Sequence, residues 1–123
     1  MSLLISVCLL VVAVIHLLPL VGVLGAARLE RLYGLAFTDP TLVLLMRHRA
    51  VLFGLLAVFL AIAAVHRPWQ GPALVAGAVS VISFLLLAAA LPERSPAIQT
   101  VLRADLIALV ALVVAAAARL ASR

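Results

Sequence analysis

Four long apolar runs, separated by short polar segments, dominate the sequence. They cover about residues 3–27, 40–65, 72–91 and 96–119 and contain few charged side chains. At about 1.5 Å of rise per residue, a helical run of this length can cross a hydrocarbon core of about 30 Å. The pattern therefore predicts an all-α integral membrane protein in which residues 1–123 form a single transmembrane domain.

The polar segments carry the residues that start and stop helices. Asp39-Pro40 and Ser95-Pro96 each place a capping side chain directly before a proline at the first helical position. Two prolines and a glycine predict a tight turn at residues 66–72. Because the connections are short, we expect the four helices to form an antiparallel up-down bundle.

A short amphipathic helix is predicted between the first two spans, at about residues 26–34. Leucine and tyrosine fall on one side of it, and the charged residues Arg28, Glu30 and Arg31 fall on the other. This pattern is typical of a helix that lies in the membrane interface. Within the first span, Pro19 is expected to introduce a kink.

Composition supports the membrane prediction and excludes other classes. Of the 123 residues 68% are hydrophobic and 11% are charged, which is more apolar surface than a soluble domain of this size can bury. The net charge is +5, but the basic residues are scattered at span ends, so we expect membrane lipids and no nucleic acid as partners. Cys8, the only cysteine, excludes an intramolecular disulfide and a cysteine-based metal site.

Arginines near the span ends predict the orientation. One side of the bundle would carry both termini and the 66–72 turn, and the other would carry the 28–40 and 92–95 connections. The second side holds more of the arginines: Arg28, Arg31, Arg47, Arg49, Arg94 and Arg103, against Arg67, Arg119 and Arg123. By the positive-inside rule the second side is cytoplasmic, and in a bacterial inner membrane both termini would be periplasmic.

Several polar residues are predicted to lie inside the membrane and in the same leaflet. The helix between Asp105 and Arg119 rises only about 21 Å, less than the hydrocarbon core of about 30 Å, so Asp105 falls below the surface. His16 falls near the middle of the first span. Antiparallel threading brings these two residues to the level of Arg47 to Arg49, Ser80 and Ser83.

Helix periodicity predicts the directions of these side chains. Small residues form one stripe on the second span, namely Ala50, Gly54, Ala57, Ala61 and Ala64. Arg47 continues that stripe and is expected to point inward, whereas His48 and Arg49 rotate away at about 100° per residue. An isolated aspartate in hydrocarbon becomes neutral or finds a cation, and the preferred partner of Asp105 is Arg47 or Arg49.

The predicted function is binding of a lipophilic or anionic-headed small molecule in this polar pocket, with chemical transformation of that molecule as an open alternative. His16 and Asp105 are the candidate catalytic residues, because both can exchange protons or hydrogen bonds. The candidate ligand and anion contacts are Arg47, Arg49, His48, Ser80 and Ser83. Structural readings stay open for the same residues: an Arg-Asp ion pair, an interhelical hydrogen bond of His16, and an arginine girdle at the headgroups.

Other functions fit the same pattern. The small-residue stripes suit a non-catalytic accessory or assembly subunit that packs against another membrane protein or in a homodimer. An oligomeric transporter is a further alternative. No metal site and no cofactor are predicted, although His16 and His48 on different helices leave haem ligation open.

Three segments resemble a family of small proteobacterial four-helix membrane proteins near the DoxX-like group. They are residues 15–19 (IHLLP), 31–34 (RLYG) and, above all, 45–54 (LMRHRAVLFG). The resemblance implies a four-helix fold and makes His16 and the Arg-His-Arg triplet family features. Members are often labelled phosphopantetheine adenylyltransferase, a soluble enzyme with an H-x-G-H motif. This chain has neither the motif nor a soluble domain, so the sequence contradicts that label.

Overall fold

The computed structural model describes residues 2–122, and the regular secondary structure of that part is helical throughout. The helices are α1 (Ser2–Leu17), the 3-10 helix η1 (Leu18–Leu24), α2 (Ala26–Tyr33), α3 (Pro40–Val65), the 3-10 turn η2 (Arg67–Trp69), α4 (Gln70–Ala89) and α5 (Pro96–Ala121). Within the described residues, four helical segments are long and apolar enough to cross a membrane. The prediction of an all-helical chain with four such segments is confirmed.

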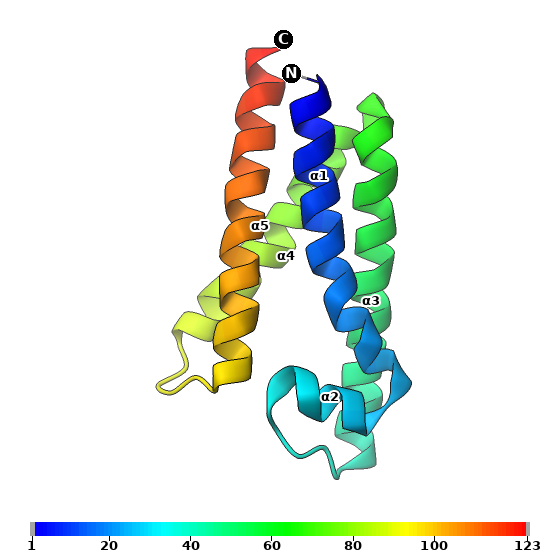
Figure 1. Ribbon diagram of the computed structural model, residues 1–123, viewed down its shortest axis with the longest axis vertical. Helices are drawn as coiled ribbons and strands as arrows, with labels where there is room; N and C mark the ends of the chain where they lie inside the picture. The colour runs from blue at the N-terminus through cyan, green and yellow to red at the C-terminus, as the bar shows by residue number, and fades with distance from the viewer. Residues whose placement is uncertain (1, 123) are drawn as a thin grey trace.

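The four long segments run alternately up and down (Figure 1). The start of α1, the end of α5 and the turn between α3 and α4 lie at one end of the bundle, while α2 lies across the other end. Helix α1 packs against α3 and α5, and α4 closes the bundle by packing against the same two helices. This is the up-down arrangement that the short connections predict.

The first span is where helix geometry departs most from the prediction. Helix α1 ends at Leu17 and continues as η1, because Pro19 has no N–H to donate and its ring clashes with the preceding turn. Gly25, with φ of 133°, then breaks the chain direction, so the span ends at Leu24 rather than at residue 27. Pro19 therefore interrupts the α-helix of the first span as expected, and the interruption extends over the 3-10 helix η1.

The predicted caps start α3 and α5. The Asp39 carboxylate accepts a hydrogen bond of 2.9 Å from the Thr41 N–H, and the Ser95 hydroxyl accepts one of 3.2 Å from the Ile98 N–H. Both bonds satisfy amide groups that have no partner within a helix. Gly34 ends α2 in the left-handed region, with φ of 68°.

Three boundaries of the last two spans shift by two residues each. Helix α4 begins at Gln70 rather than at residue 72, because Pro72 falls in its first turn, where no backbone donor is needed. It ends at Ala89 rather than at residue 91, and α5 extends to Ala121 rather than to residue 119. Helix α3 has the predicted limits.

Small residues bring the helices close together around a few large apolar side chains. Leu9, Val12, Leu60 and Val81 are fully buried, and the alanines that surround them share this burial: Ala63, Ala73, Ala108 and Ala115. Most of the predicted stripe on α3 is buried as well. Close approach of backbones is the usual source of helix association in apolar surroundings.

Gly77 lies at a close contact between α4 and α5. A Cβ at this position would lie 3.1 Å from Leu112 Cδ2 and 3.6 Å from Leu60 Cδ2. Replacing Gly77 by leucine should therefore lower the free energy of unfolding by about 1–3 kcal/mol through overpacking. Thermal unfolding in detergent measures this, with the exposed Val79 changed to leucine as the control on the same helix. Equal melting temperatures for the two variants would contradict the close packing.

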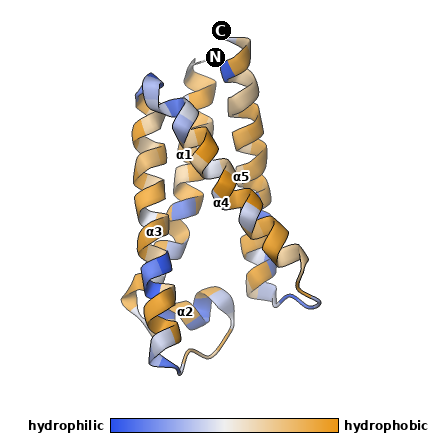
Figure 2. Ribbon diagram, turned by 180° about the vertical axis from the view of Figure 1, so that it is seen from behind, coloured by the Kyte–Doolittle hydropathy of each residue, from blue (hydrophilic) through white to orange (hydrophobic). Residues whose placement is uncertain are grey.

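Hydrophobic residues cover most of the long helices, as Figure 2 shows. Hydrophilic residues gather in α2, in the adjacent part of α3 and in the connections between helices. The polar groups that can carry chemistry are therefore concentrated at the end of the bundle that α2 covers.

Candidate functional site

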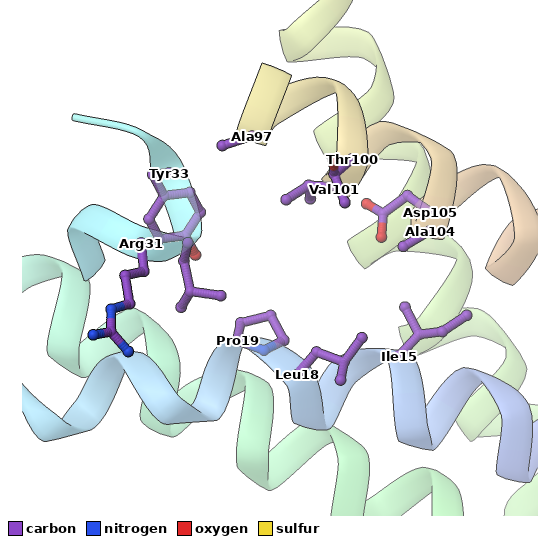
Figure 3. A pocket seen from close by; sticks show the side chains of 11 residues that line it. Ile15, Leu18, Pro19, Arg31, Tyr33, Ala97, Thr100, Val101, Ala104 and Asp105 are labelled. Carbon is purple, nitrogen blue, oxygen red and sulfur yellow. The ribbon is translucent and has the colours of Figure 1, made fainter. Parts of the chain in front are cut away.

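A cavity of about 260 Å³ lies between the end of α1 with η1, helix α2 and the first turns of α5. Its walls are mainly apolar, formed by residues such as Ile15, Leu18 and Val101. Asp105 and Thr100 line it from α5, and Tyr33 and Arg31 line it from α2 on the opposite side (Figure 3). The cavity thus combines apolar walls with a few polar groups, the usual composition of a small-molecule site.

The Asp105 carboxylate points into this cavity (Figure 3). The arginines expected to neutralise it bond elsewhere: Arg47 donates to the Val23 carbonyl oxygen and Arg49 donates to the Tyr33 hydroxyl. Within residues 2–122 neither arginine forms an ion pair with Asp105, so the predicted pair is wrong. The carboxylate therefore keeps its hydrogen-bonding capacity directed at the cavity.

The predicted inward direction of Arg47 is wrong, whereas Arg49 is directed at neighbouring helices, one of the two directions that its rotation away from the stripe allows. Arg47 is exposed, and its Nε donates to the Val23 carbonyl oxygen over 2.8 Å. The reason is that η1 packs against this part of α3, with Gly22 beside Ala50, so the stripe is already covered where Arg47 would point inward. A long arginine side chain at that position runs along the surface to the η1 backbone.

Arg49 occupies an aromatic slot and is half-buried. Its guanidinium carbon lies 4.5 Å from the ring centre of Phe53, 5.5 Å from that of Tyr33 and 5.9 Å from that of Phe84. Cation–π contacts of this kind replace part of the hydration that the charge loses. They join α3 to α2 and to α4, and the bond to the Tyr33 hydroxyl fixes the wall of the cavity.

Tyr33 and Thr100 are site residues that the sequence analysis missed. The sequence placed Tyr33 only on the apolar side of the amphipathic helix, yet its ring is buried and lines the cavity. An arginine can only donate hydrogen bonds, so Tyr33 accepts from Arg49 and its own O–H remains a donor. The signal in the sequence was the position of Tyr33 on the apolar side of the amphipathic helix. Thr100, whose hydroxyl donates to the Pro96 carbonyl oxygen over 3.0 Å, gave no such signal.

His16 is a buried residue with two hydrogen-bonded ring nitrogens. Nδ1 donates to the Val12 carbonyl oxygen over 2.9 Å, because a carbonyl can only accept. In the neutral ring Nε2 then accepts from the Ser80 hydroxyl over 3.1 Å. His16 does not line the cavity into which Asp105 points. The structure therefore does not bring the two candidate catalytic residues together, and the interhelical hydrogen bond is the arrangement observed.

The candidate anion contacts are divided as well. Arg49 and Ser80 line a second cavity of about 220 Å³, between α3 and α4. His48 and Ser83 are exposed, and the Ser83 hydroxyl donates to the Ser80 carbonyl oxygen. The predicted five-residue contact set thus does not converge on one point.

Metal and haem ligation have little support from side-chain geometry. The described part of the chain contains no group of three or more histidine, cysteine, aspartate or glutamate side chains arranged to hold a metal ion. Cys8 is buried in α1. Haem ligation by His16 would require its bond to Ser80 to break, and His48 lies exposed on another helix.

The His16–Ser80 bond is expected to stabilise the contact between α1 and α4. Changing Ser80 to alanine leaves the buried Nε2 without a donor, which should lower the free energy of unfolding by about 1–3 kcal/mol. Denaturant or thermal unfolding in a mild detergent measures the loss. Ser83→Ala is the matched control, since Ser83 is exposed on the same helix. A Ser80 variant as stable as the Ser83 variant would show that the bond contributes nothing.

Comparison with known proteins adds no further assignment. The chain matches no protein-family model, no curated protein and no solved structure. Its resemblance to small four-helix proteins near the DoxX-like group therefore stays a prediction.

Proposed function

We propose that the protein is a multi-pass membrane protein that binds a lipophilic small molecule. A hydroxyl or amine group of that molecule donates a hydrogen bond to the Asp105 carboxylate. The observation that carries this proposal is the Asp105 carboxylate, which points into a mainly apolar cavity, while Arg47 and Arg49 donate their hydrogen bonds to other groups. A carboxylate in apolar surroundings is costly unless it accepts hydrogen bonds. A ligand hydroxyl or amine meets that demand.

Membrane insertion is supported by the outward faces of the bundle. The long helices expose large apolar side chains along their whole length, for example Leu3, Val58, Val110 and Leu120. Soluble proteins rarely expose continuous apolar surfaces of this extent. In the proposed setting, a bacterial inner membrane, the arginine-rich α2 end faces the cytoplasm and both termini face the periplasm.

The polar groups of the cavity define which chemistry is available to the bound molecule. Asp105 accepts hydrogen bonds or a proton, and the Tyr33 O–H donates, since Arg49 already donates to its oxygen. Any acid–base step on the bound molecule would fall to these two residues. His16 is held by Ser80 and takes no part in the proposed site.

Native mass spectrometry of the purified protein in a mild detergent tests the proposal. The expected result is a small lipophilic molecule, with a hydroxyl or amine group, that stays bound to the folded protein and disappears in an Asp105 variant. A protein that carries no such molecule, and takes up none from added membrane extract, would refute the proposal. A stoichiometric partner protein in the same preparation would instead favour an accessory or assembly subunit.

A further inference from the structure

A third and larger hollow lies beside the cavity that contains Asp105, along the surface between α1 and α5. It has a volume of about 550 Å³, and its lining is almost entirely apolar. Val7 and Val11 of α1 line its far part, and Ile15, Leu18 and Ala104 are shared with the cavity that contains Asp105. We call this hollow the α1–α5 groove. Three shared residues make the two spaces neighbours across a common wall.

The two spaces differ in polarity in the way that the two ends of an amphiphile differ. The cavity is lined by the polar residues Arg31, Tyr33, Thr100 and Asp105, whereas the residues that line the α1–α5 groove have no polar side chain. The cavity alone, at about 260 Å³, is smaller than typical ligand sites of about 300–1,000 Å³. A ligand with its polar group at Asp105 would therefore extend beyond the cavity, and the groove begins next to that residue, at Ala104.

We infer that the bound molecule is a single-chain amphiphile whose hydroxyl or amine head lies at Asp105 and whose hydrocarbon chain lies in the α1–α5 groove, directed toward the termini. This inference rests on the proposed function. The direction follows from the fold, because α1 carries Val7 nearer the end of the bundle where the termini lie. From Ile15 to Val7 the helix rises about 12 Å, which sets the length of chain that the groove can hold.

Membrane lipid tails can also occupy the groove, so the ligand chain is preferred there only if the polar head of the ligand is bound at Asp105. Lipid tails are as apolar as leucine, so an apolar groove alone would not select a molecule. Occupancy of the groove should therefore fall when the head loses its partner at Asp105. That dependence is the property to measure.

Photolabelling with long-chain primary alcohols tests the inference. One probe carries a diazirine next to the hydroxyl and a second carries it at the chain end, and peptides are mapped by mass spectrometry in lipid nanodiscs. The head-proximal probe should label α5 near Val101 and Ala104, and the chain-end probe should label α1 near Val7 and Val11. Both labels should fall about tenfold in Asp105→Asn, the change expected for loss of one hydrogen bond to a charged group. Matched amine probes identify which donor the site prefers.

Two variants separate the groove from the rest of the lipid-facing surface. Ala104 lines both spaces, so the larger side chain in Ala104→Phe should occupy the start of the groove and abolish labelling of α1 by the chain-end probe. Val110→Phe, at an exposed position of the same helix that lines neither space, should change nothing. Chain-end labelling that is spread evenly over lipid-facing positions, or that persists in Asp105→Asn, would overturn the inference alone. Absence of Asp105-dependent labelling by the head-proximal probes would overturn the proposed function as well.

Discussion

Replacing Asp105 by asparagine is expected to weaken binding of the lipophilic molecule by about tenfold or more, with no loss of folded protein. The binding loss follows because the amide is a poorer acceptor than a carboxylate, and hydrogen bonds to charged groups contribute about 1.5–3 kcal/mol. The fold should survive because neither Arg47 nor Arg49 depends on Asp105: they bond to Val23 and Tyr33. Removing a half-buried charge without a partner should leave the melting temperature unchanged or higher.

The matched control is Arg103→Gln, which changes the charge of an exposed residue on the same helix. Ligand titration followed by native mass spectrometry and thermal unfolding in the same detergent give the two quantities needed. If the Asp105 variant unfolds and the Arg103 variant does not, Asp105 has a structural partner and the cavity loses its proposed ligand contact. If affinity is unchanged in both, the head of the molecule lies elsewhere.

The helices of this protein follow from local features of the sequence. The apolar runs, the two cap-proline pairs and the glycine after α2 each act within a few residues, so their consequences are visible without the fold. The first span is the exception. Pro19 predicts that its α-helix is interrupted, but the length of the 3-10 segment η1 depends on how that segment packs against α3. The steric properties of proline therefore predict where the α-helix is interrupted, but not how many residues the interruption includes.

The site depends on contacts between segments far apart in the sequence, and so it was predicted only in part. Asp105 was identified because a charge in an apolar run is costly wherever its helix packs. The partners of Arg47 and Arg49 depend on where η1 and α2 cross α3, which periodicity along α3 cannot show. His16 was correctly placed within the bundle, but its bond to Ser80 on α4 assigns it to a different polar cluster from Asp105.

Helix α2 connects the cavity to the Arg-His-Arg triplet. Tyr33 on α2 forms one wall of the cavity, and the end of α2 approaches the start of α5, where Gly34 lies beside Ala97 and Ser95. Arg49 holds the same tyrosine from α3. Arg49 of the triplet therefore positions the wall that faces Asp105.

This arrangement predicts that Arg49→Met will loosen α2 and weaken ligand binding, whereas Arg47→Met will do neither. Methionine keeps much of the side-chain volume but loses the bond to the Tyr33 hydroxyl and the cation–π contacts with Tyr33, Phe53 and Phe84. Losing a charged hydrogen bond and a partly desolvated cation–π contact should cost about 2 kcal/mol or more. The cost should appear as faster amide hydrogen exchange over residues 26–37.

Hydrogen exchange read by mass spectrometry, with and without ligand, separates this role from general destabilisation. In Arg49→Met we expect faster exchange in α2, unchanged exchange in the central parts of α1 and α5, and an affinity reduced about tenfold. The exposed Arg47 bonds to the backbone of η1, so its variant should match the unmodified protein over α2. Uniformly faster exchange throughout the bundle would make Arg49 a general structural residue. If the two variants have the same exchange rates in α2 and the same ligand affinity, Arg49 does not support the site, because only Arg49 bonds to Tyr33.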